Sequence, residues 1–201
     1  KINEVIPESS AENTEYGLAL IGTFSGWDAS LHWAQYFDDT AHVKITKVTS
    51  IPGLGAVPTL EQRHSRLTMG GATLSIPSGN FIWKAEAAKL QGMEFALVND
   101  KTFSRTDVLV GTEYSGWSDT SLTLEFGVQH LNDFDEKLEE SPDSELEDRI
   151  ATTFSFMQDY LNQTLHLNMV GMMIGKSGMD GGINRMSLKY DVMDALSVSG
   201  G

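Results

Sequence analysis

Residues 107–129, DVLVGTEYSGWSDTSLTLEFGVQ, decide the fold, because apolar and polar residues alternate on either side of a short turn. Successive side chains of a β-strand point to opposite faces, so this pattern predicts two strands of a hairpin. Residues 116–119, Gly-Trp-Ser-Asp, supply the turn. The apolar face carries Val108, Val110, Leu122, Leu124, Phe126 and Val128. The opposite face carries small residues and the carboxylates Asp107, Glu113 and Glu125.

Two all-β architectures produce such a hairpin. A water-soluble sandwich buries the apolar face in a core between two sheets. A transmembrane barrel turns the apolar face to lipid and the polar face to its lumen. The sequence contains no run of eighteen or more apolar residues, which excludes a membrane-spanning helix. Barrel strands need only about 9–11 residues, half of them polar, and remain allowed.

Composition excludes several other classes. The chain has 201 residues, with 14 Lys and Arg against 28 Asp and Glu and a net charge of -14. We therefore expect no nucleic-acid partner, since phosphate binding requires clustered basic residues. The absence of cysteine excludes disulfides and thiolate metal sites. No basic segment followed by an apolar segment opens the chain, so we expect any signal peptide to be absent from it.

The turns and loops differ systematically in length. Residues 1–15 are polar and unpatterned, which predicts an extended lead-in, and residues 16–201 contain about ten predicted strands. Short turns near residues 26, 78, 117, 162 and 194 alternate with long loops. These loops are residues 38–64, 91–105, 131–148 and 175–182. The first contains a short β-like piece at Val43–Val48 and could carry its own β-ribbon. Short periplasmic turns on one rim and long extracellular loops on the other are typical of outer-membrane barrels.

Aromatic residues gather beside the short turns. They are Phe24, Trp27, Phe81, Trp83, Tyr114, Trp117, Tyr160 and Tyr190. Amphipathic rings at one height form the girdle that barrels place at the lipid–water interface. Together with the loop pattern, this predicts an all-β fold, namely a transmembrane antiparallel up-and-down β-barrel of the outer-membrane type.

Charged side chains are predicted to line the lumen. The candidates are His32, Arg66, Lys84, Glu86, Asp107, Glu113, Glu125, Arg149, Asp159, Arg185 and Lys189. Charges of both signs on an inner wall can form a stiffening network between strands. They can also create a transverse field along a channel, and the sequence leaves both interpretations open.

We expect no catalytic site and no cofactor. His32 with Asp28 and Glu113 is the best acid–base candidate, but lumen polarity and loop solvation are the favoured explanation of these residues. The five histidines are not paired at metal-ligand spacing. The acidic segment after residue 131 offers oxygen ligands suited to Ca²⁺, with Asp133, Asp135 and Glu136 as candidates. It lacks the spacing of an EF-hand, so a solvated charged loop is the competing interpretation.

Four segments carry a family resemblance: EYGLALIGTFSGWDASLHWAQYFDD (15–39), RHSRLTMGGATLSIPSGNFIWKAEAA (63–88), RTDVLVGTEYSGWSDTSLTLEFGVQHLNDFDEKL (105–138) and residues 156–201. In order and spacing they resemble a large proteobacterial outer-membrane family known as a domain of unknown function, with porin-like topology. The resemblance implies that this chain is an internal portion of a larger barrel in a Gram-negative outer membrane. It also implies passage of hydrophobic or aromatic small molecules.

We therefore expect an outer-membrane porin-like channel or transporter for small molecules. One alternative is a structural or adhesion barrel with a plugged lumen that acts through its outer loops. A third hypothesis is an outer-membrane hydrolase that depends on His32 or Asp107. The expected partners are outer-membrane lipid, a small-molecule solute, and a protein at the loops or completing the barrel.

Overall fold

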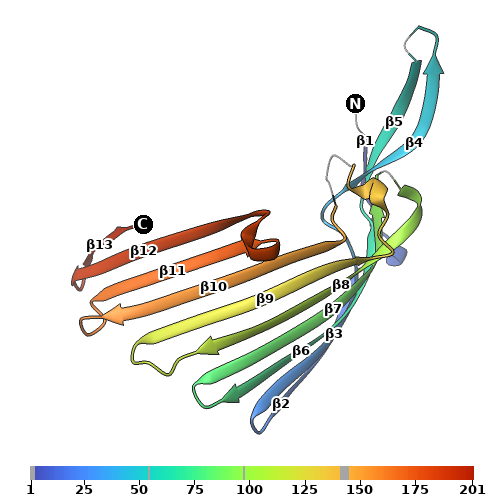
Figure 1. The fold of residues 1–201 in the computed structure, drawn as a ribbon. Coiled ribbons are helices and arrows are strands. Elements are labelled where there is room, and N and C mark those ends of the chain that lie inside the picture. The colour runs from blue at the N-terminus through green and yellow to red at the C-terminus, as the bar shows by residue number, and fades with distance from the viewer. Residues whose placement is uncertain (1–2, 54, 97, 141–144) are drawn as a thin grey trace.

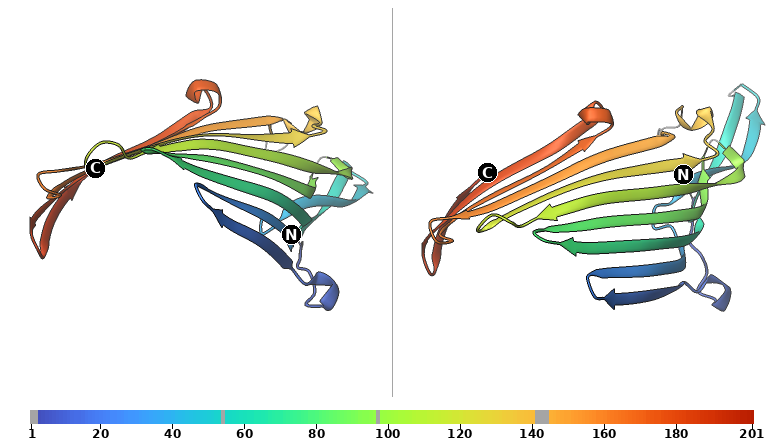
Figure 2. Two further views of the ribbon diagram at one scale, coloured as in Figure 1. Left: turned by 90° about the horizontal axis from the view of Figure 1, so that it is seen from below. Right: turned by 60° about the horizontal axis from the view of Figure 1, so that its bottom comes forward.

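The computed structural model describes residues 3–53, 55–96, 98–140 and 145–201. Ten of its thirteen strands form one antiparallel sheet, and neighbours in the chain are neighbours in the sheet except where β3 meets β6. The strands lie side by side from the β2 edge to the β13 edge, and the sheet is twisted and curved (Figures 1 and 2). In order across the sheet they are β2 (Tyr16–Phe24), β3 (Trp27–Phe37), β6 (Arg66–Ser78), β7 (Phe81–Phe95), β8 (Val98–Tyr114), β9 (Thr120–Asn132), β10 (Asp148–Tyr160), β11 (Leu165–Ile174), β12 (Gly181–Met193) and β13 (Leu196–Gly200).

The predicted all-β, antiparallel, up-and-down arrangement is confirmed. The sheet is not closed, because β2 and β13 pair with one neighbour each. Both strand edges therefore present backbone groups that no strand in the described residues satisfies.

A second, three-stranded sheet stands at the end of the main sheet. It contains β1 (Asn3–Val5), which runs parallel to β5 (Gly55–Arg63), and β4 (His42–Ile51), which pairs antiparallel with β5. The β4–β5 hairpin projects away from the main sheet (Figure 1). Residues 38–64 were predicted as a long loop that could carry its own β-ribbon, and this ribbon is present as the β4–β5 hairpin. The predicted strand piece, Val43–Val48, was too short, because β4 extends from His42 to Ile51. The lead-in 1–15 likewise contains β1 and a short 3₁₀ helix, η1 (Ala11–Asn13).

The predicted loop at 91–105 is also wrong, because β7 continues to Phe95 and β8 already begins at Val98. The pairing of these strands shifts register between Gln91 and Met93 and again between Met93 and Phe95. Gly92 lies in this irregular stretch with φ +98°, a conformation that favours glycine. Each shift offsets the pairing by an odd number of residues, which exchanges the two faces and makes the strands hard to recognise from a period of two.

The other two predicted loops are shorter than expected. The connection after β9 contains a 3₁₀ helix, η2 (Glu136–Leu138), and β10 begins at Asp148. Residues 141–144 of this acidic segment lie outside the described residues. The connection after β11 contains η3 (Lys176–Gly178), and β12 begins at Gly181.

The hydrophobic core is small and lies at the loop end of the sheet. Leu138 of η2 is completely buried, and it packs with Val98, Phe103 and Leu131. Phe103 and Leu131 belong to the polar side of β8 and β9, since Leu131 pairs with Arg105. The β9–β10 connection therefore folds inward over the polar side of the sheet, while most large apolar side chains elsewhere remain exposed.

Candidate functional site

The strand register divides the main sheet into two faces of opposite character. Cross-strand partners share a face, so partner relations can be followed from strand to strand. Starting from Val110, the pairs lead to Ala85 and Leu74 in one direction and to Phe126 in the other. We call this side the apolar face. It includes Leu18, Leu20, Leu31, Trp33, Leu74, Ala85, Val108, Val110, Leu124, Phe126, Phe154, Met169, Met186 and Leu188.

The apolar face is exposed and has two clear borders. Leu20 is 69% exposed and Val110 is 48% exposed, although each lies in the middle of a paired strand. On β8 the apolar run extends from Tyr114 to Val108, six residue steps or about 20 Å along the strand. Beyond Val108, toward the loop end, the same face carries a row of polar residues on four neighbouring strands: Lys89, Thr106, His130 and Asp148.

Aromatic rings mark the border at the short turns. Phe24 stacks on Trp27 with a centroid distance of 4.1 Å, and Phe81 lies 4.7 Å from Tyr114. Trp117, in the turn after β8, lies 5.1 Å from Tyr114. The other predicted girdle residues are at the same ends of their strands: Trp83, Tyr160 and Tyr190. A further aromatic contact, not predicted from the sequence, joins Tyr16 and Trp33 toward the loop end of the same face, with 5.6 Å between the ring centroids.

The opposite side of the sheet, which we call the polar face, carries all but one of the predicted lumen residues. They are His32, Lys84, Glu86, Asp107, Glu113, Glu125, Arg149, Asp159, Arg185 and Lys189. Arg66 is the exception, because it pairs with Phe37 on the side of the apolar face. Its guanidinium donates to Gln35 at 3.1 Å and lies 5.4 Å from the Phe37 ring centroid. The glycines at 70–71 hide the alternation of β6, which explains the wrong assignment.

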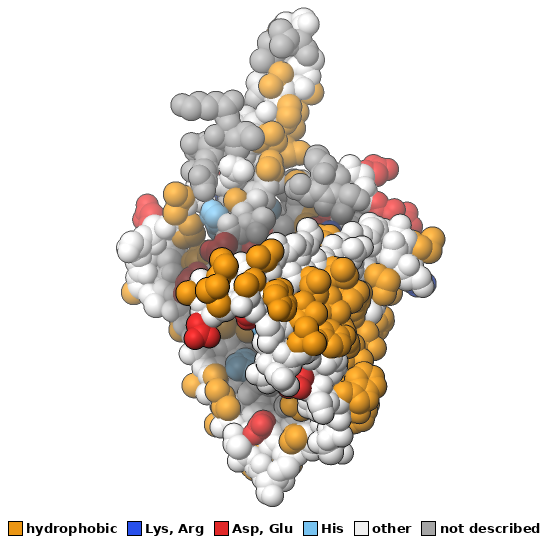
Figure 3. Space-filling view, turned by 90° about the vertical axis from the view of Figure 1, so that its left-hand side faces the viewer, with side chains coloured by type: hydrophobic (Ala, Val, Ile, Leu, Met, Phe, Trp, Pro, Cys, Tyr) orange, Lys and Arg blue, Asp and Glu red, His pale blue; other side chains and the backbone are white. Residues whose placement is uncertain are grey.

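A groove of about 630 Å³ crosses the polar face from β3 to β11. Its floor is low because two pairs of neighbouring strands contribute small residues on either side of β8: Gly71 and Ala88 from β6 and β7, and Gly127 and Ala151 from β9 and β10. Met69, Leu109 and Ile174 add apolar walls, while His32, Glu86, Asp107 and Arg149 add polar groups. Figure 3 shows hydrophobic side chains gathered on one side of the molecule, with acidic and histidine side chains recessed in a hollow beside them.

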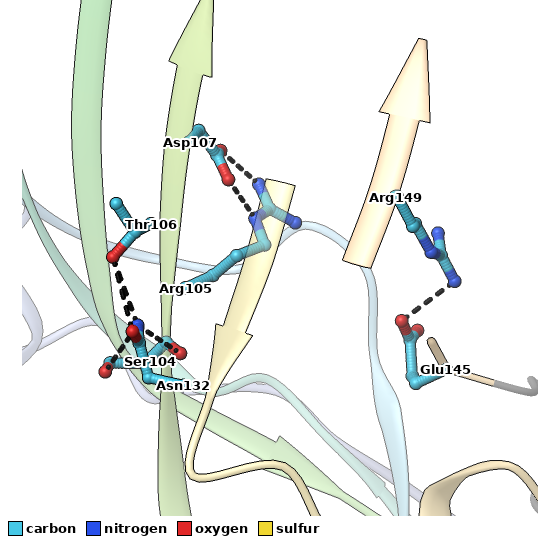
Figure 4. A network of polar contacts seen from close by, with 7 residues as sticks. All are labelled: Ser104, Arg105, Thr106, Asp107, Asn132, Glu145 and Arg149. Carbon is cyan, nitrogen blue, oxygen red and sulfur yellow. Dashed lines mark hydrogen bonds and ion pairs between the residues drawn. The ribbon is translucent and has the colours of Figure 1, made fainter. Parts of the chain in front are cut away.

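Ion pairs fix several of the charged residues at the loop end of the groove. Arg105 binds Asp107 in a bidentate manner, with N–O distances of 2.8 and 2.9 Å. Arg149 lies 2.8 Å from Glu145, which belongs to the inward-folded β9–β10 connection (Figure 4). Asn132 donates to the Ser104 carbonyl at 3.0 Å. Bidentate arginine–carboxylate pairs hold both partners in one geometry, so this end of the groove is structurally fixed.

The candidate acid–base residues are not brought together. The Nε2 atom of His32 lies 2.6 Å from the Ser30 hydroxyl, and this hydroxyl also lies 2.6 Å from that of Thr73. Asp107 lines the same groove as His32, but strands β6 and β7 separate them, about 14 Å at the usual strand spacing. Glu113 pairs instead with Lys84, at 3.2 Å. This spacing is too large for direct proton transfer between His32 and either carboxylate.

A different histidine makes the closest carboxylate contacts, near the short-turn rim. His166 lies 2.6 Å from Asp159 and 3.0 Å from Asp191, on the two neighbouring strands. Lys189 is 2.8 Å from the other oxygen of Asp191. Asp159 and Lys189 were predicted from the sequence as lumen residues, but their cluster with His166 and Asp191 was not predicted. The cluster forms because the register of β10, β11 and β12 places His166 opposite Asp159 on one side and Lys189 on the other.

The candidate Ca²⁺ ligands lie around η2 and have other partners. The Asp135 carboxylate accepts the backbone N–H of Lys137 at 3.1 Å and lies 3.9 Å from the ammonium of Lys101. Lys101 also donates to the Asp133 carbonyl at 3.0 Å. Within the described ranges, no three His, Cys, Asp or Glu side chains are grouped as metal ligands. The ammonium group of Lys101 neutralises part of the charge that a cation would need here.

A partly buried histidine joins the small sheet to the main one. His42 of β4 lies 3.2 Å from Glu94 of β7, and its Nδ1 atom is 3.1 Å from the Ser65 hydroxyl. Lys44 lies 3.4 Å from the same Glu94 oxygen. Burial lowers the pKa of His42, and the nearby Glu94 carboxylate opposes this shift in part. The base of the projecting hairpin is therefore fixed by polar contacts that sequence analysis did not detect.

Comparisons of this chain with protein-family models, with curated proteins and with solved structures gave no match. Among the residues that the structure describes, no helix has the length and apolar character needed to cross a membrane.

Proposed function

We propose that the ten-stranded sheet is part of the wall of a transmembrane β-barrel of the outer-membrane type, which carries small solutes across a bacterial outer membrane. The observation that carries this proposal is the exposed apolar face, which extends over all strands from β2 to β12 and lies opposite a polar face with a groove. A continuous exposed apolar surface of this extent needs lipid or another protein to cover it.

The borders of the apolar face favour lipid as the covering phase. The polarity of a bilayer changes with depth. A membrane protein therefore carries amphipathic aromatic rings at the level of the lipid–water interface and polar side chains beyond the hydrocarbon layer. The aromatic border at the short turns meets the first requirement, and Lys89, His130 and Asp148 meet the second. A second protein sheet would cover the same apolar area without requiring either border.

The polar face supports passage of solutes without chemistry. Its groove combines small floor residues with charges of both signs, as in a water-filled pathway along a barrel wall. His32 and Asp107, the residues on which the hydrolase alternative depends, are separated by strands β6 and β7 and do not form an acid–base pair. The family resemblance adds hydrophobic or aromatic small molecules as the solutes to test first.

The experiment is single-channel recording of the detergent-purified, full-length protein in a planar bilayer. Migration in gels before and after heating shows whether a folded barrel is present. We expect heat-modifiable migration and steady openings. A folded barrel without conductance would refute the channel, and migration unaffected by heat would refute the membrane barrel.

The projecting β4–β5 hairpin favours a second function, binding of a protein partner at the outer rim. Val48 is 60% exposed and Val57 is 36% exposed on this hairpin, which stands clear of the main sheet (Figure 1). Deletion of residues 46–58 should abolish partner or cell-surface binding and leave conductance unchanged. Binding that survives the deletion would exclude the hairpin as the contact.

A further inference from the structure

Most charged side chains of the polar face are neutralised by a neighbour. Lys84 pairs with Glu113 at 3.2 Å, Arg105 with Asp107 at 2.8 Å, and Lys189 with Asp191 at 2.8 Å. Arg149 pairs with Glu145 of the inward-folded connection at 2.8 Å. These pairs contribute little net charge to the groove at a distance.

Three carboxylates of the same face lack a cationic partner among the described residues: Asp28, Glu86 and Glu125. Glu86 lies in the groove, opposite Thr73 on one side and Leu109 on the other, so neither cross-strand neighbour is basic. Glu125 accepts a hydrogen bond from the Thr153 hydroxyl at 3.1 Å and is opposite Gly111. Asp28 is opposite Ser75 at the short-turn end.

The polar face also has a basic side chain without an acidic partner among the described residues, and it lies far from these three carboxylates. Arg185 of β12 is opposite Val170 and has no carboxylate partner in the described part of the chain. Two strands, β10 and β11, separate it from Glu125 on β9. The wall from β3 to β10 therefore has an excess of negative charge that its own arginine and lysine side chains do not cancel.

We propose that the groove makes this pathway selective for cations, with Glu86 as the main determinant and Glu125 as a second one. The inference rests on the proposed function and names the class of solute, which is a small inorganic or organic cation. Fixed carboxylates beside apolar walls focus a negative potential into the groove, and this potential attracts cations and repels anions. Met69, Leu109 and Ile174 supply those walls.

The test is the reversal potential of the full-length protein in a planar bilayer with a tenfold KCl gradient. We expect the wild type to prefer K⁺ over Cl⁻. Glu86→Gln should reduce the permeability ratio at least about twofold, as expected for one charge about 8 Å from the ion path in a water-filled groove. Glu125→Gln should reduce it less, because Glu125 is not among the residues that line the groove, and Glu86→Lys should reduce it most.

Matched controls separate this effect from a general loss of charge. Glu139→Gln removes one carboxylate beside η2, outside the groove, and should leave the ratio unchanged. Arg185→Gln should leave it unchanged or raise it. A wild-type channel without cation preference, or a ratio unaffected by Glu86→Gln, would overturn the inference alone. A folded barrel without any conductance would overturn the proposed function and the inference with it.

Discussion

Val110 is the position where the lipid-facing assignment can be tested most directly. It lies on the apolar face of β8 between Ala85 and Phe126, and its side chain is 48% exposed. Four residue steps separate it from Tyr114 of the aromatic border, about 13 Å along the strand. With the usual strand tilt of about 40°, Val110 lies about 10 Å below the girdle, near the middle of an apolar band about 25 Å tall.

The perturbation is Val110→Arg. An arginine on the lipid face costs about 2–4 kcal/mol at the bilayer midplane and about 0–1 kcal/mol near the interface. We therefore expect Val110→Arg to lower the free energy of unfolding by about 2–4 kcal/mol. Thr106→Arg is the matched control on the same strand and face, four steps in the other direction, and pairs with Lys89 and His130. It should cost about 0–1 kcal/mol.

The assay is reversible denaturant unfolding of the full-length protein from phospholipid vesicles, followed by tryptophan fluorescence. The depth dependence is the decisive quantity, because a surface in contact with water would tolerate both substitutions within about 0.5 kcal/mol. Equal costs for Val110→Arg and Thr106→Arg would refute the assignment of this face to lipid.

Three further predictions concern the loop end of the molecule. Leu138→Ala removes the one completely buried large side chain of the described core, so it should cost about 2–5 kcal/mol of local stability, measured by hydrogen exchange of the β9–β10 connection. Unchanged exchange there would show that the connection does not depend on this contact. Gly92→Ala places a Cβ against the Arg66 carbonyl at a φ of +98°, whereas the Cβ added by Gly70→Ala meets open space. Only Gly92→Ala should therefore lower the free energy of unfolding, by about 1–3 kcal/mol, measured by denaturant unfolding. The pKa of His42 is lowered in the folded state, so folding favours the neutral ring. The contribution of His42 to the free energy of unfolding is therefore fully present above the pKa of the unfolded chain, and it is lost as the pH falls below that pKa. The protection factors of the β4–β5 hairpin amides, which correct for the intrinsic pH dependence of exchange, should therefore fall between pH 7.5 and pH 5. A His42→Gln variant should lack this decrease.

The sequence by itself determined the strands and their two faces wherever alternation was unbroken. From Asp107 to Tyr114 and from Leu122 to Gln129 each side chain lies on the face that its position in the period predicts. Alternation is a local property of an extended chain, so it needs no knowledge of distant residues. The positions of the aromatic residues beside the short turns followed from the sequence for the same reason.

Only the tertiary structure decided the features that depend on pairing between strands. Residues 91–105 were predicted as a loop but are mostly strand, with register shifts near Gly92. Arg66 was predicted on the polar face, but it pairs with Phe37 and lies on the side of the apolar face. The groove depends on register, because pairing brings Gly71 opposite Ala88 and Gly127 opposite Ala151 on the same face, on either side of β8. No local pattern specifies which residues pair, because this depends on the register between neighbouring strands. A shift of one residue in the register would exchange the two faces.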